Sequence, residues 1–161
     1  RRRHTRYISV TGVQTCALPI LAKAEEKLKT IKGLEKTSDH FSVLDSISIE
    51  DQMVMLRAVL KRSQKDKERD YEKLLKTYQS GDLDKISQLD ETITGGMLPK
   101  ALWEQMKLKL IDERNVDMAD GLIANASESS VFAAVGASHL GGKEGILSRL
   151  ADAGYKVSPV K

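Results

Sequence analysis

The carboxyl-terminal thirty residues constrain the fold of this chain more than any other segment. Residues 131–160 read VFAAVGASHLGGKEGILSRLADAGYKVSPV. An apolar, β-rich run over 131–135 leads into a turn that ends at His139, and an amphipathic helix then precedes an alternating segment over 155–160. This order predicts a strand, a loop, a helix and a second strand. Glycines beside His139 let the backbone approach other groups closely, so the turn is a candidate site.

The fold class predicted from this unit is α/β, helix-rich with a small, mainly parallel sheet. Two strands that flank a helix and share a sheet are expected to run parallel, with a right-handed crossover. A third strand is expected over 30–34. It would deliver Glu35 to the same sheet edge as His139, and ligands of open α/β sheets bind at that edge, outside the carboxyl ends of the strands.

Helical patterns cover much of the remaining sequence. Ser48 and Asp51 resemble a capping box, which predicts a helix that begins near residue 49. A long helix is predicted from residue 99 or 100 to about 125, because apolar side chains recur on one face. Residues 36–39 are expected to form a loop that leaves His40 exposed. Shorter helical patterns cover 21–29, 71–78 and 82–89.

Residues 1–20 do not resemble the rest of the chain. They hold four Arg, no acid and the only cysteine, Cys16. The stretch VTGVQTCALPI resembles the translation of a sequencing-library adapter, so we interpret residues 1–20 as a non-native segment and residues 21–161 as the native domain. The alternative is a basic targeting arm, but polar residues and a glycine interrupt the apolar run that a secretory signal requires.

Removal of this segment changes the charge of the chain. The whole sequence has 26 Lys and Arg against 23 Asp and Glu, a net charge of +3; without the four Arg the counts are 22 and 23, a net charge of −1. Nucleic-acid binding requires clustered, uncompensated cations, so we expect no nucleic-acid partner. Residues 21–161 contain no cysteine and hence no disulfide framework. No apolar run approaches the roughly 18 residues of a membrane span, and the composition assigns no compartment.

Three segments, 30–56, 112–123 and 135–160, together resemble the TraB/PrgY/GumN family, which includes the Tiki-type metalloproteases. The most specific pattern is Val-Gly-x-x-His-Leu-x-Gly-x-x-Gly, which begins at Val135. The resemblance implies an α/β fold in which two Gly-x-x-His motifs converge on one site, and metal-dependent peptidase activity in the Tiki-type members. Only the second motif, Gly136 to His139, is present. We therefore expect the chain to be the carboxyl-terminal portion of a family domain.

The resemblance also selects the candidate site residues. His139 is the candidate metal ligand, and Glu35, Glu113 and Arg114 are the candidate catalytic residues. A carboxylate at such a site acts as a base or orients a histidine, and an arginine stabilises developing negative charge. Three further positions are candidate structural members of the motifs: Gly136, Gly142 and Asn115.

Each candidate also has an ordinary structural interpretation. His139 can be a strand-end histidine bonded to nearby backbone, and Glu35 a surface acid. Arg114 can form a salt bridge with Glu113 or Asp117, which is worth little if exposed. Since a metal site needs three or four ligands, we expect a divalent metal ion only in the intact parent protein, and no activity from this fragment alone.

The leading functional hypothesis is therefore part of a metal-dependent hydrolase that acts on peptides. The alternative is a non-catalytic peptide-binding or regulatory protein, whose recognition surface would be the helices between residues 49 and 93. A phosphate-binding loop is not expected, because such a loop needs Gly-x4-Gly-Lys followed by Ser or Thr. Glu144 replaces that hydroxyl here and would repel phosphate.

Deletion of residues 1–20 tests the non-native interpretation. We expect the free energy of unfolding to stay unchanged or to increase, because a non-native segment makes no selected packing contacts. Urea denaturation of the two chains measures the difference. A loss above about 1 kcal/mol, which exceeds the usual effect of surface changes, would show that the segment packs against the domain.

Overall fold

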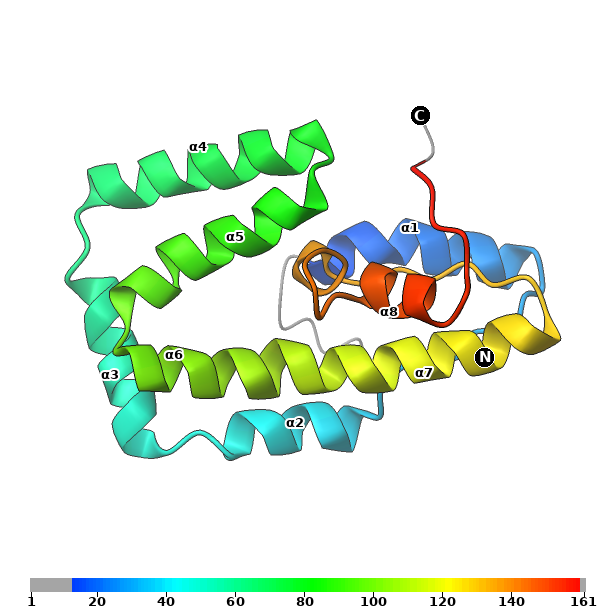
Figure 1. The fold of residues 1–161 in the computed structure, drawn as a ribbon, viewed down its shortest axis with the longest axis horizontal. Coiled ribbons are helices and arrows are strands. Elements are labelled where there is room, and N and C mark those ends of the chain that lie inside the picture. Colours follow the sequence, from blue (N-terminus) through cyan, green and yellow to red (C-terminus); the bar gives the residue numbers. More distant parts are fainter. Residues whose placement is uncertain (1–12, 160–161) are drawn as a thin grey trace, which may run out of the picture. The chain divides into compact units, whose positions relative to one another are not determined.

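The computed structural model describes residues 13–159, and all the regular elements in that range are helical (Figure 1). The chain divides into two units, residues 1–33 and residues 34–161. The α-helices are α1 (Val13–Glu26), α2 (Thr37–Asp45), α3 (Ile49–Leu60), α4 (Gln64–Ser80), α5 (Leu83–Ile93), α6 (Lys100–Lys107), α7 (Glu113–Glu128) and α8 (Ile146–Asp152). Three short helices join them: the 3₁₀-helices η1 (Gly95–Met97) and η3 (Ala137–His139), and the π-helix η2 (Leu108–Asp112).

The predicted α/β fold with a small parallel sheet is wrong, since residues 13–159 contain no strand. The segments expected as strands, 30–34, 131–135 and 155–159, have no regular secondary structure there; residue 160 lies outside the described range. A strand requires a neighbour with which to exchange hydrogen bonds, and these segments do not pair with one another. Phe132, which was expected to be covered inside a sheet, is 79% exposed.

The described part of the first unit consists mainly of α1. This helix was predicted from residue 21, but it begins at Val13 and so includes Pro19 and part of the segment that we interpret as non-native. Leu18, Ile20 and Leu21 are exposed on it. A helical conformation over 13–20 does not by itself decide the origin of these residues, because isolated helices form from local propensity as well as from packing.

Side-chain caps begin three helices of the second unit, α3, α4 and α5, whereas α2 begins after Lys36 without one. Ser48 Oγ accepts a hydrogen bond from the amide of Asp51 at 3.1 Å, so the predicted N-cap at Ser48 is confirmed. The same arrangement begins α4 at Ser63 and α5 at Asp82. The Asp51 carboxylate accepts from the Ser48 hydroxyl at 2.8 Å, in place of the bond to the Ser48 amide that a capping box has. The loop predicted over 36–39 is wrong, because α2 already begins at Thr37 and includes His40.

The long helix predicted from residue 99 or 100 to about 125 is confirmed. α6, η2 and α7 form one continuous rod from Lys100 to Glu128 (Figure 1). The π-helical turn η2 lies in its middle, directly before Arg114 and Asn115. Most of the side chains predicted to face inward are buried: Leu102, Met106, Met118 and Leu122.

The apolar core of the second unit lies where α7 meets α8, which run side by side (Figure 1). Met118, Ala119 and Leu122 pack against Ile146 there. Three partly buried side chains cover the edge of this cluster: Leu34, Val135 and Leu150. The core therefore joins the segment before α2 and the loop after α7 to the pair of helices.

The loop between η3 and α8 lies in direct contact with the backbone of α5. A Cβ atom at Gly141 would lie 2.4 Å from the carbonyl oxygen of Leu83, and a Cβ at Gly145 would lie 2.3 Å from the carbonyl oxygen of Gly141. Gly142 has a φ of +83° and donates its amide to Asp84 Oδ1 at 2.7 Å. Only glycine allows this approach.

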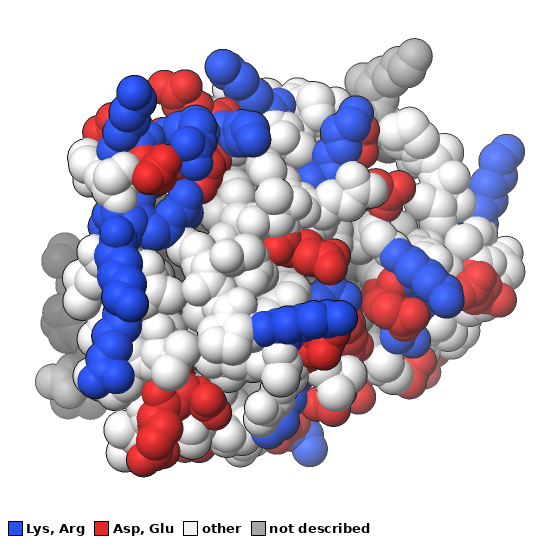
Figure 2. Space-filling view, turned by 60° about the vertical axis from the view of Figure 1, so that its left-hand side comes forward, with Lys and Arg blue, Asp and Glu red and all other residues white. Residues whose placement is uncertain are grey.

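The surface carries charges of both signs. On the face that Figure 2 brings forward, Lys and Arg lie among Asp and Glu, and uncharged residues occupy the area between them. Ion pairs join several neighbouring opposite charges, such as Asp82 with Lys85 and Asp66 with Arg69. In the part of the chain that the structure describes, no helix is both long and apolar enough to cross a bilayer.

The glycine contacts predict a sharp difference between two substitutions. Gly141→Ala should lower the free energy of unfolding by about 1–3 kcal/mol, the usual cost of overpacking, because its Cβ meets backbone that no rotamer change can move. Gly96→Ala is the matched control, since its Cβ meets nothing within 4 Å. Urea denaturation followed by circular dichroism measures both. Equal stability of the two variants would contradict the close packing of this loop.

Candidate functional site

His139 ends the 3₁₀-turn η3, which the Gly-x-x-His motif forms. The amide of His139 donates to the carbonyl of Gly136 at 3.0 Å and so closes the turn. Gly136 has a φ of −62°, and a Cβ there would lie 3.6 Å from the His139 ring, an ordinary contact. Within this structure the turn itself therefore does not require a glycine at 136, whereas Gly142 occupies a conformation that favours one.

Glu35 and Arg114 form a two-pronged ion pair across 79 residues of sequence. Arg114 Nε donates to Glu35 Oε1 at 2.6 Å, and Nη2 donates to Oε2 at 2.8 Å. The third nitrogen, Nη1, donates to the carbonyl of Leu110 in the π-helical turn at 2.8 Å. Both side chains are mostly buried. The pair therefore ties the segment before α2 to the middle of the long helix.

This ion pair also sets the electrostatics of the cluster. The hydrogen bond from Arg114 lowers the pKa of Glu35, although partial burial acts in the opposite direction. Burial lowers the pKa of His139, and the charge of Arg114 lowers it further, while Glu35 opposes both effects. The lowered pKa favours the neutral imidazole of His139 at pH 7, within range of the charge of Arg114.

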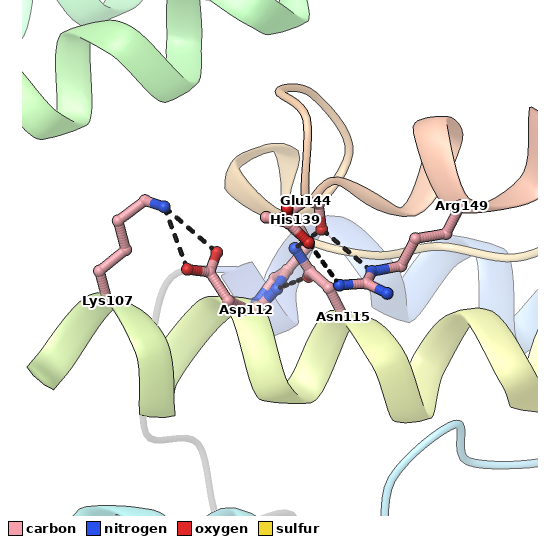
Figure 3. A network of polar contacts seen from close by, with 6 residues as sticks. All are labelled: Lys107, Asp112, Asn115, His139, Glu144 and Arg149. Carbon is pink, nitrogen blue, oxygen red and sulfur yellow. Dashed lines mark hydrogen bonds and ion pairs between the residues drawn. The ribbon is translucent and has the colours of Figure 1, made fainter. Parts of the chain in front are cut away.

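Asn115 links His139 to the loop before α8 (Figure 3). Its side chain is almost completely buried, at 1% exposure. Asn115 Oδ1 lies 2.7 Å from His139 Nδ1, and Nδ2 donates to the main-chain carbonyl of Glu144 at 2.9 Å. Arg149 of α8 also contacts Glu144, through its carboxylate at 2.7 Å and its carbonyl at 3.3 Å.

The structure brings four of the predicted residues together but not Glu113. The four are Glu35, Arg114, Asn115 and His139. Arg114 and Asn115 are neighbours on α7, and through them Glu35 and His139 come close enough for their charges to act on each other. Glu113 is exposed, and its side chain makes no hydrogen bond or ion pair within the described residues. The grouping of Glu35, Arg114 and His139 arises from helix and loop contacts, not from the edge of a sheet.

The described residues do not fit a metal ion as they stand. Between residues 13 and 159, no group of three or more His, Cys, Asp or Glu side chains is placed to hold one, and a protein site normally uses three or four ligands. Both carboxylate oxygens of Glu35 face Arg114. Among the side-chain ligand atoms of Glu35 and His139, only His139 Nε2 has no hydrogen-bond partner in the described chain, and it is not buried from solvent.

A groove of about 1010 Å³ lies beside this cluster. The amino end of α5, the long helix and the glycine loop form its walls. Asn115 and Ser138 line it, but His139, Glu35 and Arg114 do not. Asp112 on its wall forms an ion pair with Lys107 at 3.0 Å (Figure 3).

Sequence reasoning did not foresee the contact between Asn115 and His139 or the bond between Asp84 and Gly142. The first had a signal: Asn115 lies three residues before Met118, on the inward face of a helix, and a buried amide must find hydrogen-bond partners. The bond between Asp84 and Gly142 had no such signal, because an acid in the first turn of a helix, such as Asp84 in α5, is common.

Glu35→Gln tests the ion pair. We expect it to lower the free energy of unfolding at pH 7 by about 1–3 kcal/mol, since hydrogen bonds to a charged partner contribute about that much. The lowered pKa of Glu35 means that this contribution is present above the ordinary glutamate pKa of 4.5 and is lost as the pH falls through the lower folded-state value.

Urea denaturation as a function of pH measures this contribution, with Glu113→Gln, an exposed acid beside Arg114 on α7, as the matched control. The ion pair would be contradicted if the difference in the free energy of unfolding between wild type and Glu35→Gln stayed constant from pH 7 to pH 3.

Comparison with known proteins agrees with the motifs that form this site. The sequence profile of the TraB/PrgY/gumN family matches residues 9–159, nearly the whole chain. The match includes residues 9–20, whose non-native interpretation the deletion described above tests. No curated protein and no solved structure matches the chain. The chain belongs to the TraB/PrgY/gumN family.

Proposed function

We propose that this chain forms part of a peptide hydrolase and that His139 supplies the reactive nitrogen. The observation that carries the proposal is the environment of the imidazole. Its Nδ1 is engaged by a buried amide, and its Nε2 is left without a partner in the described chain. A neutral imidazole with one free nitrogen is suited to accept a proton from an attacking water molecule or to act as a ligand.

Arg114 supports the same proposal from the other side of the cluster. A guanidinium carries five N–H groups, and Glu35 and the carbonyl of Leu110 accept three hydrogen bonds from it. The remaining N–H groups are available to a substrate oxygen. Hydrolysis of a peptide bond places negative charge on the carbonyl oxygen, and a pre-oriented donor stabilises that charge. Glu35 holds the donor in position.

The resemblance to Tiki-type proteins implies a divalent metal ion, and we retain it only as part of the proposal for the parent protein. His139 Nε2 is the candidate donor that this chain offers. The further ligands would lie outside residues 13–159, and an upstream Gly-x-x-His motif is the expected source. Glu113 stays a candidate by its position beside Arg114, without a contact that supports it.

Substitution of His139 tests the proposal in the full-length protein that carries this chain. His139→Gln should lower kcat/KM for cleavage of unfolded casein or of a mixed fluorogenic peptide library at least about 100-fold, the lower range for loss of a general acid or base. His40→Gln is the matched control, because His40 lies on α2 and acts on the cluster only through its charge on Glu35, with no side-chain hydrogen bond to it among the described residues. The same assays with and without added zinc, manganese or cobalt test whether cleavage requires a metal ion. Cleavage that survives His139→Gln would overturn the proposal.

Exposed apolar side chains on α3 and α4 favour a second candidate, a non-catalytic peptide-binding protein. Apolar side chains that gather in one exposed patch commonly mark an interaction site. Several are exposed on these helices: Ile49, Met53, Leu56, Val59, Leu60, Tyr71, Leu74, Leu75 and Tyr78. This function predicts peptide binding without cleavage, which His139→Gln would leave unchanged. The same set of assays therefore separates the two candidates.

A further inference from the structure

Asn115 is the most buried polar side chain near His139, and its contacts determine which way its amide points. The main-chain carbonyl of Glu144 can only accept a hydrogen bond. The amide group that faces this carbonyl at 2.9 Å must therefore be Nδ2, with its hydrogens. Oδ1, which has no hydrogen, must then be the atom that faces His139 Nδ1 at 2.7 Å. If Oδ1 and Nδ2 of Asn115 exchanged places, both hydrogen bonds would be lost.

This orientation fixes the position of the proton on the imidazole. A contact of 2.7 Å between Oδ1 and Nδ1 is a hydrogen bond only if Nδ1 carries the hydrogen, because Oδ1 is an acceptor. In a neutral imidazole the other nitrogen, Nε2, then holds the lone pair. The opposite tautomer would place two lone pairs against each other in a buried location, which is unfavourable.

We propose that Asn115 is a positioning residue, which holds His139 in the Nδ1–H tautomer and thereby selects Nε2 as the nitrogen that the protein presents for chemistry. The selection is a property of this chain alone, whereas its use in catalysis rests on the proposed hydrolase function. Partners of this kind commonly set both the tautomer and the ring orientation of functional histidines.

The proposal requires that the Glu144 carbonyl stay in place, and the structure supplies two reasons why it does. Arg149 Nε donates to this carbonyl at 3.3 Å, while Arg149 Nη2 pairs with the Glu144 carboxylate at 2.7 Å (Figure 3). The loop on the other side is held to α5 through the amide of Gly142 and Asp84. A chain of contacts therefore runs from α8 through Glu144 and Asn115 to the imidazole.

The direct test is the tautomer itself, observed by long-range ¹H–¹⁵N correlation of the imidazole nitrogens in the uniformly labelled chain. At about pH 8, above the ordinary histidine pKa of about 6.5, the lowered pKa of His139 keeps its imidazole neutral, so its spectrum reports the tautomer. His139 should show a protonated Nδ1 and an unprotonated Nε2. The other two histidines, His4 and His40, serve as internal references in the same spectrum.

Two variants of Asn115 separate positioning from a merely structural role. Asn115→Leu keeps the approximate size of the side chain and removes both bonds, so the fraction of His139 with the proton on Nε2 should rise at least about threefold, with His40 unchanged. Asn115→Asp keeps an acceptor toward Nδ1, so its His139 should remain in the Nδ1–H form even though the bond to Glu144 is lost. If Asn115→Leu does not fold, the aspartate variant decides.

The outcomes distinguish this inference from the proposed function. A wild-type His139 with its proton on Nε2, an unchanged tautomer in a folded Asn115→Leu, or a switched tautomer in Asn115→Asp would each overturn the positioning role. A confirmed tautomer in a protein that cleaves no peptide would overturn the hydrolase proposal and leave the positioning role intact. In an active parent protein, Asn115→Leu should lower kcat at least about tenfold with KM changed less than about threefold.

Discussion

The candidate site depends on the close approach of the glycine loop to α5. Because Gly141 and Gly145 have no side chains, the loop backbone reaches the backbone of α5 and its own preceding turn. This contact fixes where the loop crosses the long helix, so that the imidazole of His139 and the carbonyl of Glu144 both face one buried amide on α7. Because a hydrogen bond tolerates only small changes in distance and angle, both bonds of this amide depend on the position of the loop.

The helices could be predicted from the sequence to a greater extent than the rest of the fold. An N-cap such as Ser48 and the apolar repeat of the long helix are both patterns among residues that are close in the sequence. They can therefore be recognised from the sequence alone. The predicted strands failed because a strand also needs a partner. The apolar run over 131–135 and the alternation over 155–159 describe side chains that suit a sheet, but neither pattern states that a neighbouring strand is present.

The sequence selected four residues that lie together, and Glu113, which does not join them, but it did not foresee their contacts. The resemblance to the family selected Glu35, Arg114, Asn115 and His139, and the structure brings these four together without a sheet. The local expectation for Arg114 was a salt bridge with Glu113 or Asp117, yet its partner is Glu35, 79 residues away. Adjacent helical residues do not face each other, whereas pairing between distant segments depends on packing that no local pattern records.

The π-helical turn Leu108–Asp112 is the place where the long helix can change its length. A π turn is in effect an α-helix that contains one additional residue. Because the turn is wider than an α-helical one, it absorbs that residue, and α7 keeps nearly the rotation about the axis that an uninterrupted helix one residue shorter would give it. An insertion or deletion in the α-helical part before this turn would instead rotate everything after it by about 100°, which would carry the guanidinium of Arg114 and the amide of Asn115 away from their partners. Lineages that keep the arginine and asparagine pair should therefore gain or lose a residue within this turn more readily than elsewhere in the rod, at the expense of the Leu110 carbonyl that accepts from Arg114.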